Sequence, residues 1–186
     1  MPRLHLLTAV GIAVLAGSAA ADEMPVSLQV QLLSKMPTYV KTLSVPDGAA
    51  VKVLVLYPGT GEPSRSAVAV VNAVQQLGKF GAVKAEAKAV AFGDAKAFAK
   101  TLADEKPQIV YLAPEMSQRD VADIVATDLG VTLTVSGQTD HIRQGVVLGF
   151  SLVEAKPKVL VNLKHANAQG IAFTNGLMQY AVVVER

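Results

Sequence analysis

Apolar residues alternate with other residues along two short stretches near the carboxyl end of the chain. Every second residue from 148 to 152 is apolar, and the same holds from 159 to 163. A period of two is typical of strands, and the polar segment 154–157 between the stretches suits a tight turn. Pro157 fits the start of the second strand, because proline cannot donate a ladder hydrogen bond. The pattern therefore predicts an antiparallel β-hairpin.

The residues after the hairpin follow a helical pattern. Residues 164–170 predict one or two helical turns that end at Gly170, and residues 174–179 predict a second short helix. Leu177 and Met178 are its expected core contacts.

Upstream of the hairpin, strand and helix patterns alternate. Strands are expected at 51–57, 84–92, 108–113 and 131–135, and helices at 24–43 with an interruption at Pro37, 63–79, 93–105 and 117–129. The last of these helices begins with a sequence that resembles a capping box, from Ser117 to Asp120, and is expected to end at Gly130. Successive β-α-β units require right-handed crossovers and a parallel sheet. The sequence thus predicts a single α/β domain. Its sheet is mainly parallel and doubly wound with about six strands, a C-terminal antiparallel β-hairpin and helices on both faces.

The first residues have the features of a secretory signal peptide. Arg3 supplies a basic start, residues 6–17 are apolar, and small residues at 18–21 precede Asp22. The apolar run is shorter than the roughly 20 residues of a transmembrane helix. We therefore expect a Sec-type signal peptide at 1–21 and an exported domain at 22–186 that does not span the membrane after cleavage. The chain has no Cys to carry a lipoprotein anchor.

Charge and cysteine content exclude several classes of protein. Removal of Arg3 with the signal segment leaves 16 of the 17 Lys and Arg side chains, which nearly balance the 15 Asp and Glu side chains. A near-neutral chain without a basic patch is not expected to bind nucleic acid. The absence of Cys excludes disulfides, thiolate catalysis and cysteine metal sites.

The segment 136–144 gathers many polar side chains directly after a predicted parallel strand, where open α/β sheets bind ligands. The candidate ligand or partner residues in it are Gln138, Thr139, His141 and Arg143. Ser136 is a conceivable nucleophile, but the Gly-x-Ser-x-Gly pattern of a nucleophile elbow is missing. We therefore interpret this segment as a binding loop.

Other catalytic patterns are missing from the sequence. The segment 59–62 lacks the Gly-Lys-Ser/Thr of a P-loop, the acidic residues are scattered singly, and the two histidines outside the signal segment have no carboxylate at ligand spacing. Asp140 and His141 are sequence neighbours, whereas a catalytic pair usually converges from different segments. We expect no enzyme activity, no cofactor and no metal.

The carboxyl-terminal block resembles the YfiR/HmsC-like periplasmic family. The resemblance rests on the glycine-led strand at 145–152, Phe150, the strand ending 161–163, the small residues Ala166 and Gly170, and the segment 177–181, taken as helical. It covers these forty or so residues well and the preceding hundred in outline.

This resemblance implies a regulatory function. The protein after which the family is named restrains an inner-membrane diguanylate cyclase by binding its periplasmic portion. The resemblance therefore implies an exported periplasmic regulatory binding protein for cyclic-di-GMP or related signalling. Its expected partner is an inner-membrane diguanylate cyclase or sensor kinase. Whether the chain also forms a homodimer is left open by the sequence. It also places a partner-binding amphipathic helix at the start of the domain, with Val26, Val30 and Leu33 as candidates.

Two alternatives remain at this point. The β-α repeats also occur in periplasmic solute-binding proteins, which generally close two lobes around a cleft, whereas this chain holds one lobe. A single-lobe small-solute-binding protein is therefore the first alternative. A hydrolase is the second, and the missing motifs disfavour it.

Overall fold

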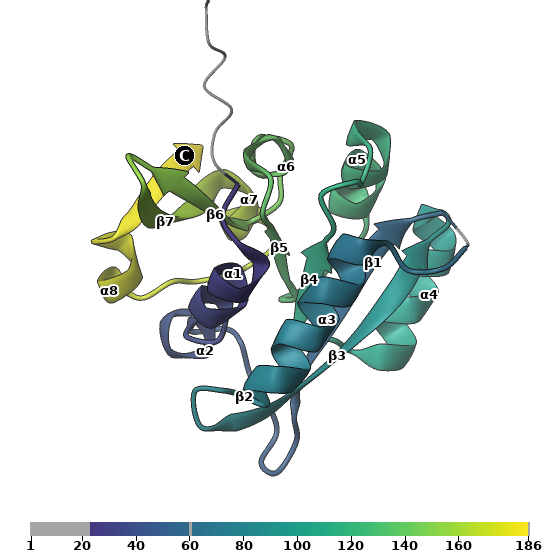
Figure 1. Cartoon of the computed structure of the whole chain (residues 1–186), viewed down its shortest axis with the longest axis horizontal. Coiled ribbons are helices and arrows are strands. Elements are labelled where there is room, and N and C mark those ends of the chain that lie inside the picture. The colour runs from purple at the N-terminus through teal and green to yellow at the C-terminus, as the bar shows by residue number, and fades with distance from the viewer. Residues whose placement is uncertain (1–22, 60, 186) are drawn as a thin grey trace, which may run out of the picture.

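One eight-stranded sheet runs through the domain in the order β2-β3-β1-β4-β5-β6-β7-β8 (Figure 1). The structure is a computed structural model and describes residues 23–59 and 61–185. The strands are β1 (Val51–Pro58), β2 (Lys79–Phe80), β3 (Val83–Phe92), β4 (Ile109–Leu112), β5 (Leu133–Ser136), β6 (Leu148–Val153), β7 (Lys156–Asn162) and β8 (Ala181–Glu185). The expected signal peptide at 1–21 lies outside the described residues.

Helices cover both faces of this sheet. They are α1 (Val26–Leu33), α2 (Met36–Tyr39), α3 (Arg65–Leu77), α4 (Ala95–Glu105), α5 (Gln118–Ala126), α6 (Thr139–Arg143), α7 (Leu163–Ala168) and α8 (Asn175–Met178). The interruption expected at Pro37 is present, because α1 ends before it and α2 carries the proline in its first turn. The predicted single α/β domain with a C-terminal hairpin is confirmed.

The centre of the sheet is parallel, as predicted. β1 pairs in parallel with β3 on one side and with β4 on the other, and β5 and β6 continue the parallel part beyond β4. Alternate side chains of β1 pack into two separate hydrophobic cores, one on each face of the sheet. Val53 and Val55 join a core with α1, α2 and α3, whereas Leu54 and Leu56 join a core with α4 and α5. A strand buried on both faces must be continuously apolar, which explains its sequence.

The strand count of about six was too low, because two strands were missed. β2 has two residues and pairs antiparallel with the start of β3. β8 pairs in parallel with β7, so the hairpin is not the edge of the sheet. The segment ending at Ala181 was expected to be helical, but α8 stops at Met178 and Ala181 opens β8. The β-branched run that follows favours a strand once β7 is available as a partner.

Helix boundaries follow from local capping. The predicted capping box at the start of α5 is present: the Ser117 hydroxyl accepts from the Asp120 amide, and the Asp120 carboxylate accepts from the Ser117 amide. The hydroxyl of Ser64 caps α3 in the same way. Gly130 does not end α5 as expected, because the helix stops at Ala126 and Thr127 takes an extended conformation.

The residues that follow α2 are joined directly to the residues that precede α8. Val40 forms an antiparallel bridge with Phe173. The Lys41 amide donates to the Ala172 carbonyl at 2.8 Å, and the Thr174 amide donates to the Tyr39 carbonyl at 2.8 Å. These bonds tie the end of α2 to the segment that precedes α8.

Candidate binding site at the carboxyl end of the sheet

The polar segment singled out in the sequence lies where β5 ends, at the carboxyl edge of the parallel strands. It was expected to be a loop, but it forms the short helix α6. The amides of His141 and Gln144 donate to the carbonyls of Gln138 and Asp140, which closes this helix. Open α/β sheets bind ligands at this edge, so the location matches the prediction.

A cavity of about 330 Å³ opens beside α6. Its walls combine the start of the described chain, the turn before α6, α6 itself and strand β6. The lining residues are Glu23, Met24, Gly137, Gln138, Thr139, Asp140, Arg143, Phe150 and Ser151. The floor is apolar where Met24 and Phe150 are buried, and the rim is polar and charged. This combination suits a small polar ligand or one side chain of a partner protein.

The structure brings together three of the expected site residues. Gln138, Thr139 and Arg143 all line the cavity. The fourth, His141, is buried behind them and does not line it. In α6, His141 and Ile142 point into the domain, so the polar segment presents only part of its polar side chains to solvent.

His141 lies against Ser136, and the two buried side chains support the segment that lines the cavity. The Ser136 hydroxyl and His141 Nδ1 lie 2.8 Å apart, and the Gln138 amide donates to the same hydroxyl at 3.1 Å. Burial lowers the pKa of His141, and a backbone hydrogen bond with Met116 and the nearby Asp140 charge partly oppose this. Both side chains are buried, so a substrate does not reach the hydroxyl in this conformation.

Charged side chains meet at the rim of the cavity. Arg143 Nη1 lies 3.1 Å from Asp140 Oδ1, and both side chains are largely exposed. Asp140 therefore points toward Arg143 and does not complete a Ser-His-Asp arrangement. The Gln138 amide nitrogen Nε2 donates to Glu23 Oε1 at 2.6 Å and links α6 to the residues before α1. The rim thus offers one basic and two acidic groups to a ligand or partner.

The apolar stripe on α1 is not an open surface. Val30 and Leu33 are 2% and 0% exposed and belong to the core that α1 shares with α3, while Val26 is half-buried against it. Helical spacing identifies an apolar face correctly but does not tell whether the same domain covers it. Burial removes Val30 and Leu33 from the expected partner surface.

A buried polar group holds α1 to the sheet below the cavity. The Tyr111 hydroxyl donates to Gln29 Oε1 at 2.6 Å, and Gln29 Nε2 donates to the Met24 carbonyl at 2.6 Å. A Cβ atom at Gly137 would lie 2.5 Å from Gln29 Oε1, so a side chain there would displace the Gln29 amide from its hydrogen bonds. Sequence reasoning missed this group, although Gln29 stands out as a polar residue within the apolar stripe of α1.

A second cavity lies at the opposite end of the sheet. It has a volume of about 460 Å³ and is lined mostly by the segments 42–44, 99–108 and 128–132. None of the expected site residues lines it. Because it opens at the amino ends of the strands, it is not at the edge where this fold usually binds ligands.

The described part of the chain shows neither a grouped set of metal ligands nor a membrane-spanning helix. Across residues 23–59 and 61–185, no three His, Asp or Glu side chains are grouped as metal ligands. Within the same ranges, no helix combines the length and apolar character that a bilayer-spanning segment needs.

The fold is a one-lobe α/β domain with a cavity at the carboxyl ends of its parallel strands. The family model described as YfiR/HmsC-like matches residues 83–182, which is more than half of the chain, and the chain belongs to this family. The resemblance found in the sequence is thereby confirmed. No curated protein matches the chain.

Solved structures share the fold at low sequence identity. The ABC domain in complex with L-Trp from Streptococcus pneumonia aligns with a TM-score of 0.58 at 12% identity, covering 86% of this chain and 61% of that one. A conserved domain protein from Vibrio cholerae aligns with a TM-score of 0.54 at 17% identity, covering 86% of this chain and 60% of that one. This chain therefore spans about three fifths of either structure, and the likeness concerns the fold alone.

Proposed function

We propose that this protein is an exported periplasmic regulator that restrains an inner-membrane signalling protein by direct contact. The partner class is a diguanylate cyclase or a sensor kinase, so the output is cyclic-di-GMP or a related signal. Membership of the YfiR/HmsC-like family is the observation that carries this proposal. The role needs a binding surface and no chemistry on the part of the protein.

The rim of the 330 Å³ cavity is the surface that the proposal assigns to the partner. Arg143 and Asp140 are exposed there, and Gln138 and Thr139 stand half-buried beside them. Arginine and well-packed apolar anchors usually dominate the energy of an interface. An apolar side chain of the partner would enter above Met24 and Phe150, while Arg143 binds a carboxylate or carbonyl of the partner.

The test is a titration with the periplasmic portion of a diguanylate cyclase or sensor kinase encoded beside this gene. Arg143→Ala should weaken binding by more than about 1 kcal/mol, because an interface arginine is lost. Arg119→Ala is the matched control, since Arg119 is exposed on α5 outside the cavity lining and its loss should leave binding unchanged. Equal affinities of the two variants for the partner would show that the partner binds at another surface. Absence of binding to any such protein would contradict the proposal.

A small solute is the second candidate ligand, favoured by the size and lining of the same cavity. One structural neighbour is itself in complex with L-Trp. A ligand that binds only the native state raises the midpoint of thermal unfolding. Screening amino acids and other small metabolites by thermal shift should therefore reveal such a ligand, and Thr139→Ala should reduce the shift if the solute occupies this cavity.

A hydrolytic function makes a different prediction at the Ser136–His141 pair. Turnover of ester, peptide or phosphate substrates that disappears on Ser136→Ala or His141→Ala, in protein that still folds and binds its partner, would establish a nucleophilic site. We expect no turnover, because both side chains are buried behind the cavity wall.

A further inference from the structure

A third cavity, of about 280 Å³, lies between the carboxyl end of α5 and the short helix α7. Its walls come from the last turn of α5, the turn 128–130 that follows it and the last turn of α7. Val125 and Leu129 form an apolar part of the wall, and the polar side chains that line it are Thr127, Asp128, His165 and Gln169. These residues are separate from those that line the 330 Å³ cavity beside α6.

The polar groups of this cavity mainly accept hydrogen bonds. The Thr127 hydroxyl donates to the Asp123 carbonyl at 2.9 Å, so it has only lone pairs to offer a ligand. The Asp128 carboxylate accepts from the Gly130 amide at 3.1 Å and forms no ion pair with any described residue. The buried Gln169 Oε1 has no donor among the described residues. Rotation of this amide about its last bond can turn the oxygen to the cavity, because that torsion is broad.

The ring of His165 is held in the cavity wall by contacts outside α7. Asn162 Nδ2 donates to the Ile142 carbonyl at 2.8 Å, and Asn162 Oδ1 accepts from the His165 amide at 3.1 Å. A Cβ atom at Gly145 would lie 2.7 Å from His165 Cε1, so the ring packs directly against this glycine. The wall is therefore fixed by the tertiary structure.

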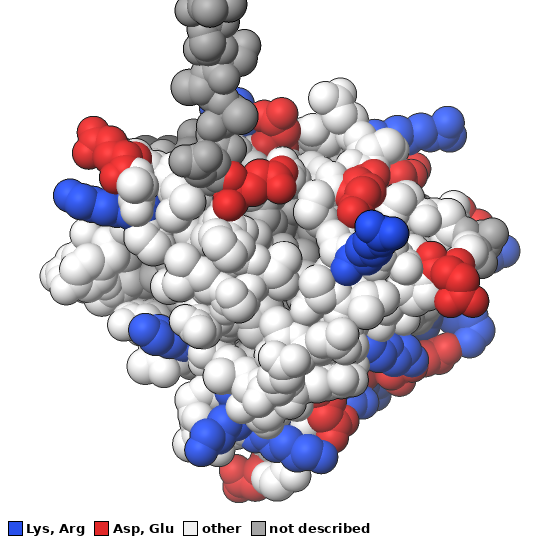
Figure 2. All heavy atoms as spheres, in the orientation of Figure 1, with Lys and Arg blue, Asp and Glu red and all other residues white. Residues whose placement is uncertain are grey.

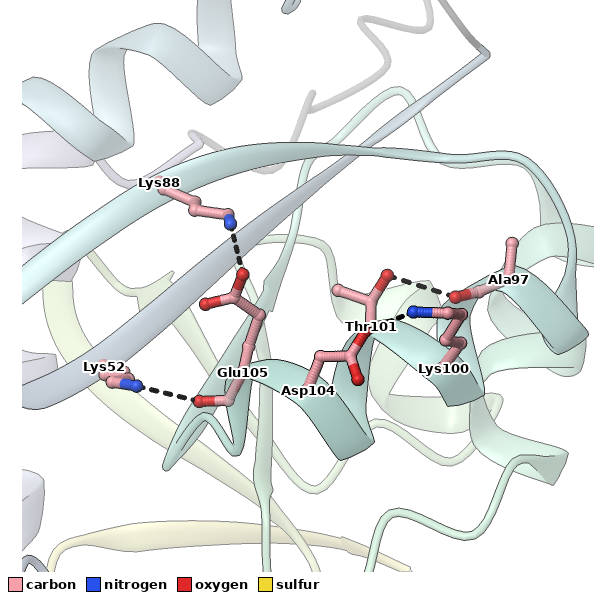
Figure 3. A network of polar contacts seen from close by, with 7 residues as sticks. All are labelled: Lys52, Lys88, Ala97, Lys100, Thr101, Asp104 and Glu105. Carbon is pink, nitrogen blue, oxygen red and sulfur yellow. Dashed lines mark hydrogen bonds and ion pairs between the residues drawn. The ribbon is translucent and has the colours of Figure 1, made fainter.

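The carboxyl end of α4 shows what the end of α5 lacks. Lys52 Nζ donates to the Glu105 carbonyl at 3.1 Å, and Lys88 pairs with the Glu105 carboxylate (Figure 3). On this side of the molecule, basic and acidic atoms lie next to each other (Figure 2). Cations stabilise the carboxyl end of a helix, because its last carbonyls carry partial negative charge. The last turn of α5 has no basic residue, and no described Lys or Arg lines its cavity. Lys106 lines the neighbouring 460 Å³ cavity but forms no ion pair with Asp128.

We propose that the 280 Å³ cavity binds a small organic cation, a primary ammonium group on a short apolar body, such as an alkylamine or a diamine. An ammonium group has three N–H donors and no acceptor, which suits the oxygens of Asp128, Thr127 and Gln169. The apolar body packs on Val125 and Leu129. A calcium ion fits this site less well, because it takes about six to eight oxygen ligands and the cavity has a single carboxylate.

The experiment is a calorimetric titration of the purified periplasmic protein with putrescine and with n-butylamine. Both should bind saturably, with dissociation constants below about 10 mM. Two matched probes should bind about tenfold more weakly or not at all: n-butanol, which lacks the charge, and tetramethylammonium, which lacks N–H donors.

Matched variants test the carboxylate. Asp128→Asn should raise the dissociation constant about tenfold or more, because the charge is lost while an acceptor for the Gly130 amide remains. Asp123→Asn is the control, since it removes the same charge from α5 at a side chain outside the cavity lining. Its affinity should stay within about twofold of wild type, as expected for a distant, screened charge.

A gain of affinity excludes a folding defect as the cause of these effects. Gln169→Glu places a second carboxylate at the cavity and should lower the dissociation constant about threefold or more. The described chain has two histidines, His141 and His165, which give separate ring signals in NMR spectra. Putrescine should shift the ring signals of His165, which lines the cavity, and leave those of the buried His141 in place.

Four results would overturn the proposal. The first is the absence of saturable binding of both amines up to about 10 mM. The second is equal affinity of Asp128→Asn and Asp123→Asn for putrescine. The third is tetramethylammonium binding as tightly as n-butylamine, since the oxygens of the cavity would then not be accepting hydrogen bonds. The fourth is amine binding that leaves the His165 ring signals unchanged, which would place the amine at another site.

Discussion

Gln29 lies in the buried stripe of α1, where its amide bonds the Tyr111 hydroxyl and the Met24 carbonyl. A buried acceptor that loses its donor costs about 1–3 kcal/mol. Tyr111→Phe removes the donor and keeps the ring, so we expect the free energy of unfolding to fall by about that amount. Chemical denaturation measures it. Tyr180→Phe is the control, because that hydroxyl is on an exposed side chain and its loss should change little.

His141 makes stability depend on pH. Burial lowers the pKa of His141 below its ordinary value of 6.5, so the folded protein holds the ring neutral. This contribution to stability is complete above pH 6.5 and is lost as the pH falls from there through the folded-state pKa, because the unfolded chain takes up the proton first. Unfolding free energies measured from pH 7.5 to pH 5 should therefore decrease, and His141→Gln should flatten the decrease. A slope unchanged in that variant would contradict this assignment.

At the scale of single elements, the hairpin strand β6 buries Phe150, which is 1% exposed, in the core that residues of α1 also join. The alternation along residues 148–152 predicted this inward face, and the burial confirms it. Phe150→Ala should cost about 3–5 kcal/mol, since a buried aromatic ring is lost and a cavity remains. Val153→Ala, on an exposed position of the same strand, should stay within about 0.5 kcal/mol. A denaturation midpoint shared by Phe150→Ala and wild type would contradict the burial.

Elements with a strong local signal could be predicted, and elements fixed by distant partners could not. The capping box at Ser117 and the apolar run of β1 depend on neighbours in sequence or on burial from both sides, so they were found. β8 becomes a strand only because β7 lies beside it, and α6 has five residues, too few for a periodic pattern. The position of the polar segment at the end of a parallel strand could be predicted for the same reason, because the strand before it has a local signal. Which side of α1 is covered depends on the whole core, and the partner residues Val30 and Leu33 were wrongly assigned.

At the scale of the whole molecule, export leads to a prediction about the amino terminus of the mature protein. Residues 1–21 lie outside the described part, but their sequence has the order of a signal peptide. Mass spectrometry of the periplasmic protein should find an amino terminus near Ala21 or Asp22. Periplasmic protein that still carries Met1 would contradict the cleavage site.

The bridge between Val40 and Phe173 has a consequence for folding during translation. Partners in this bridge region are as much as 130 positions apart, as Thr42 and Ala172 are. The ribosome synthesises the segment around Val40 early and Phe173 only near the end of translation. Until then the growing chain cannot complete its fold, because β8 and the segment that bridges to Val40 have not been synthesised. The nascent chain therefore stays open during most of its synthesis, which is the state that a secretion channel accepts and that chaperones bind.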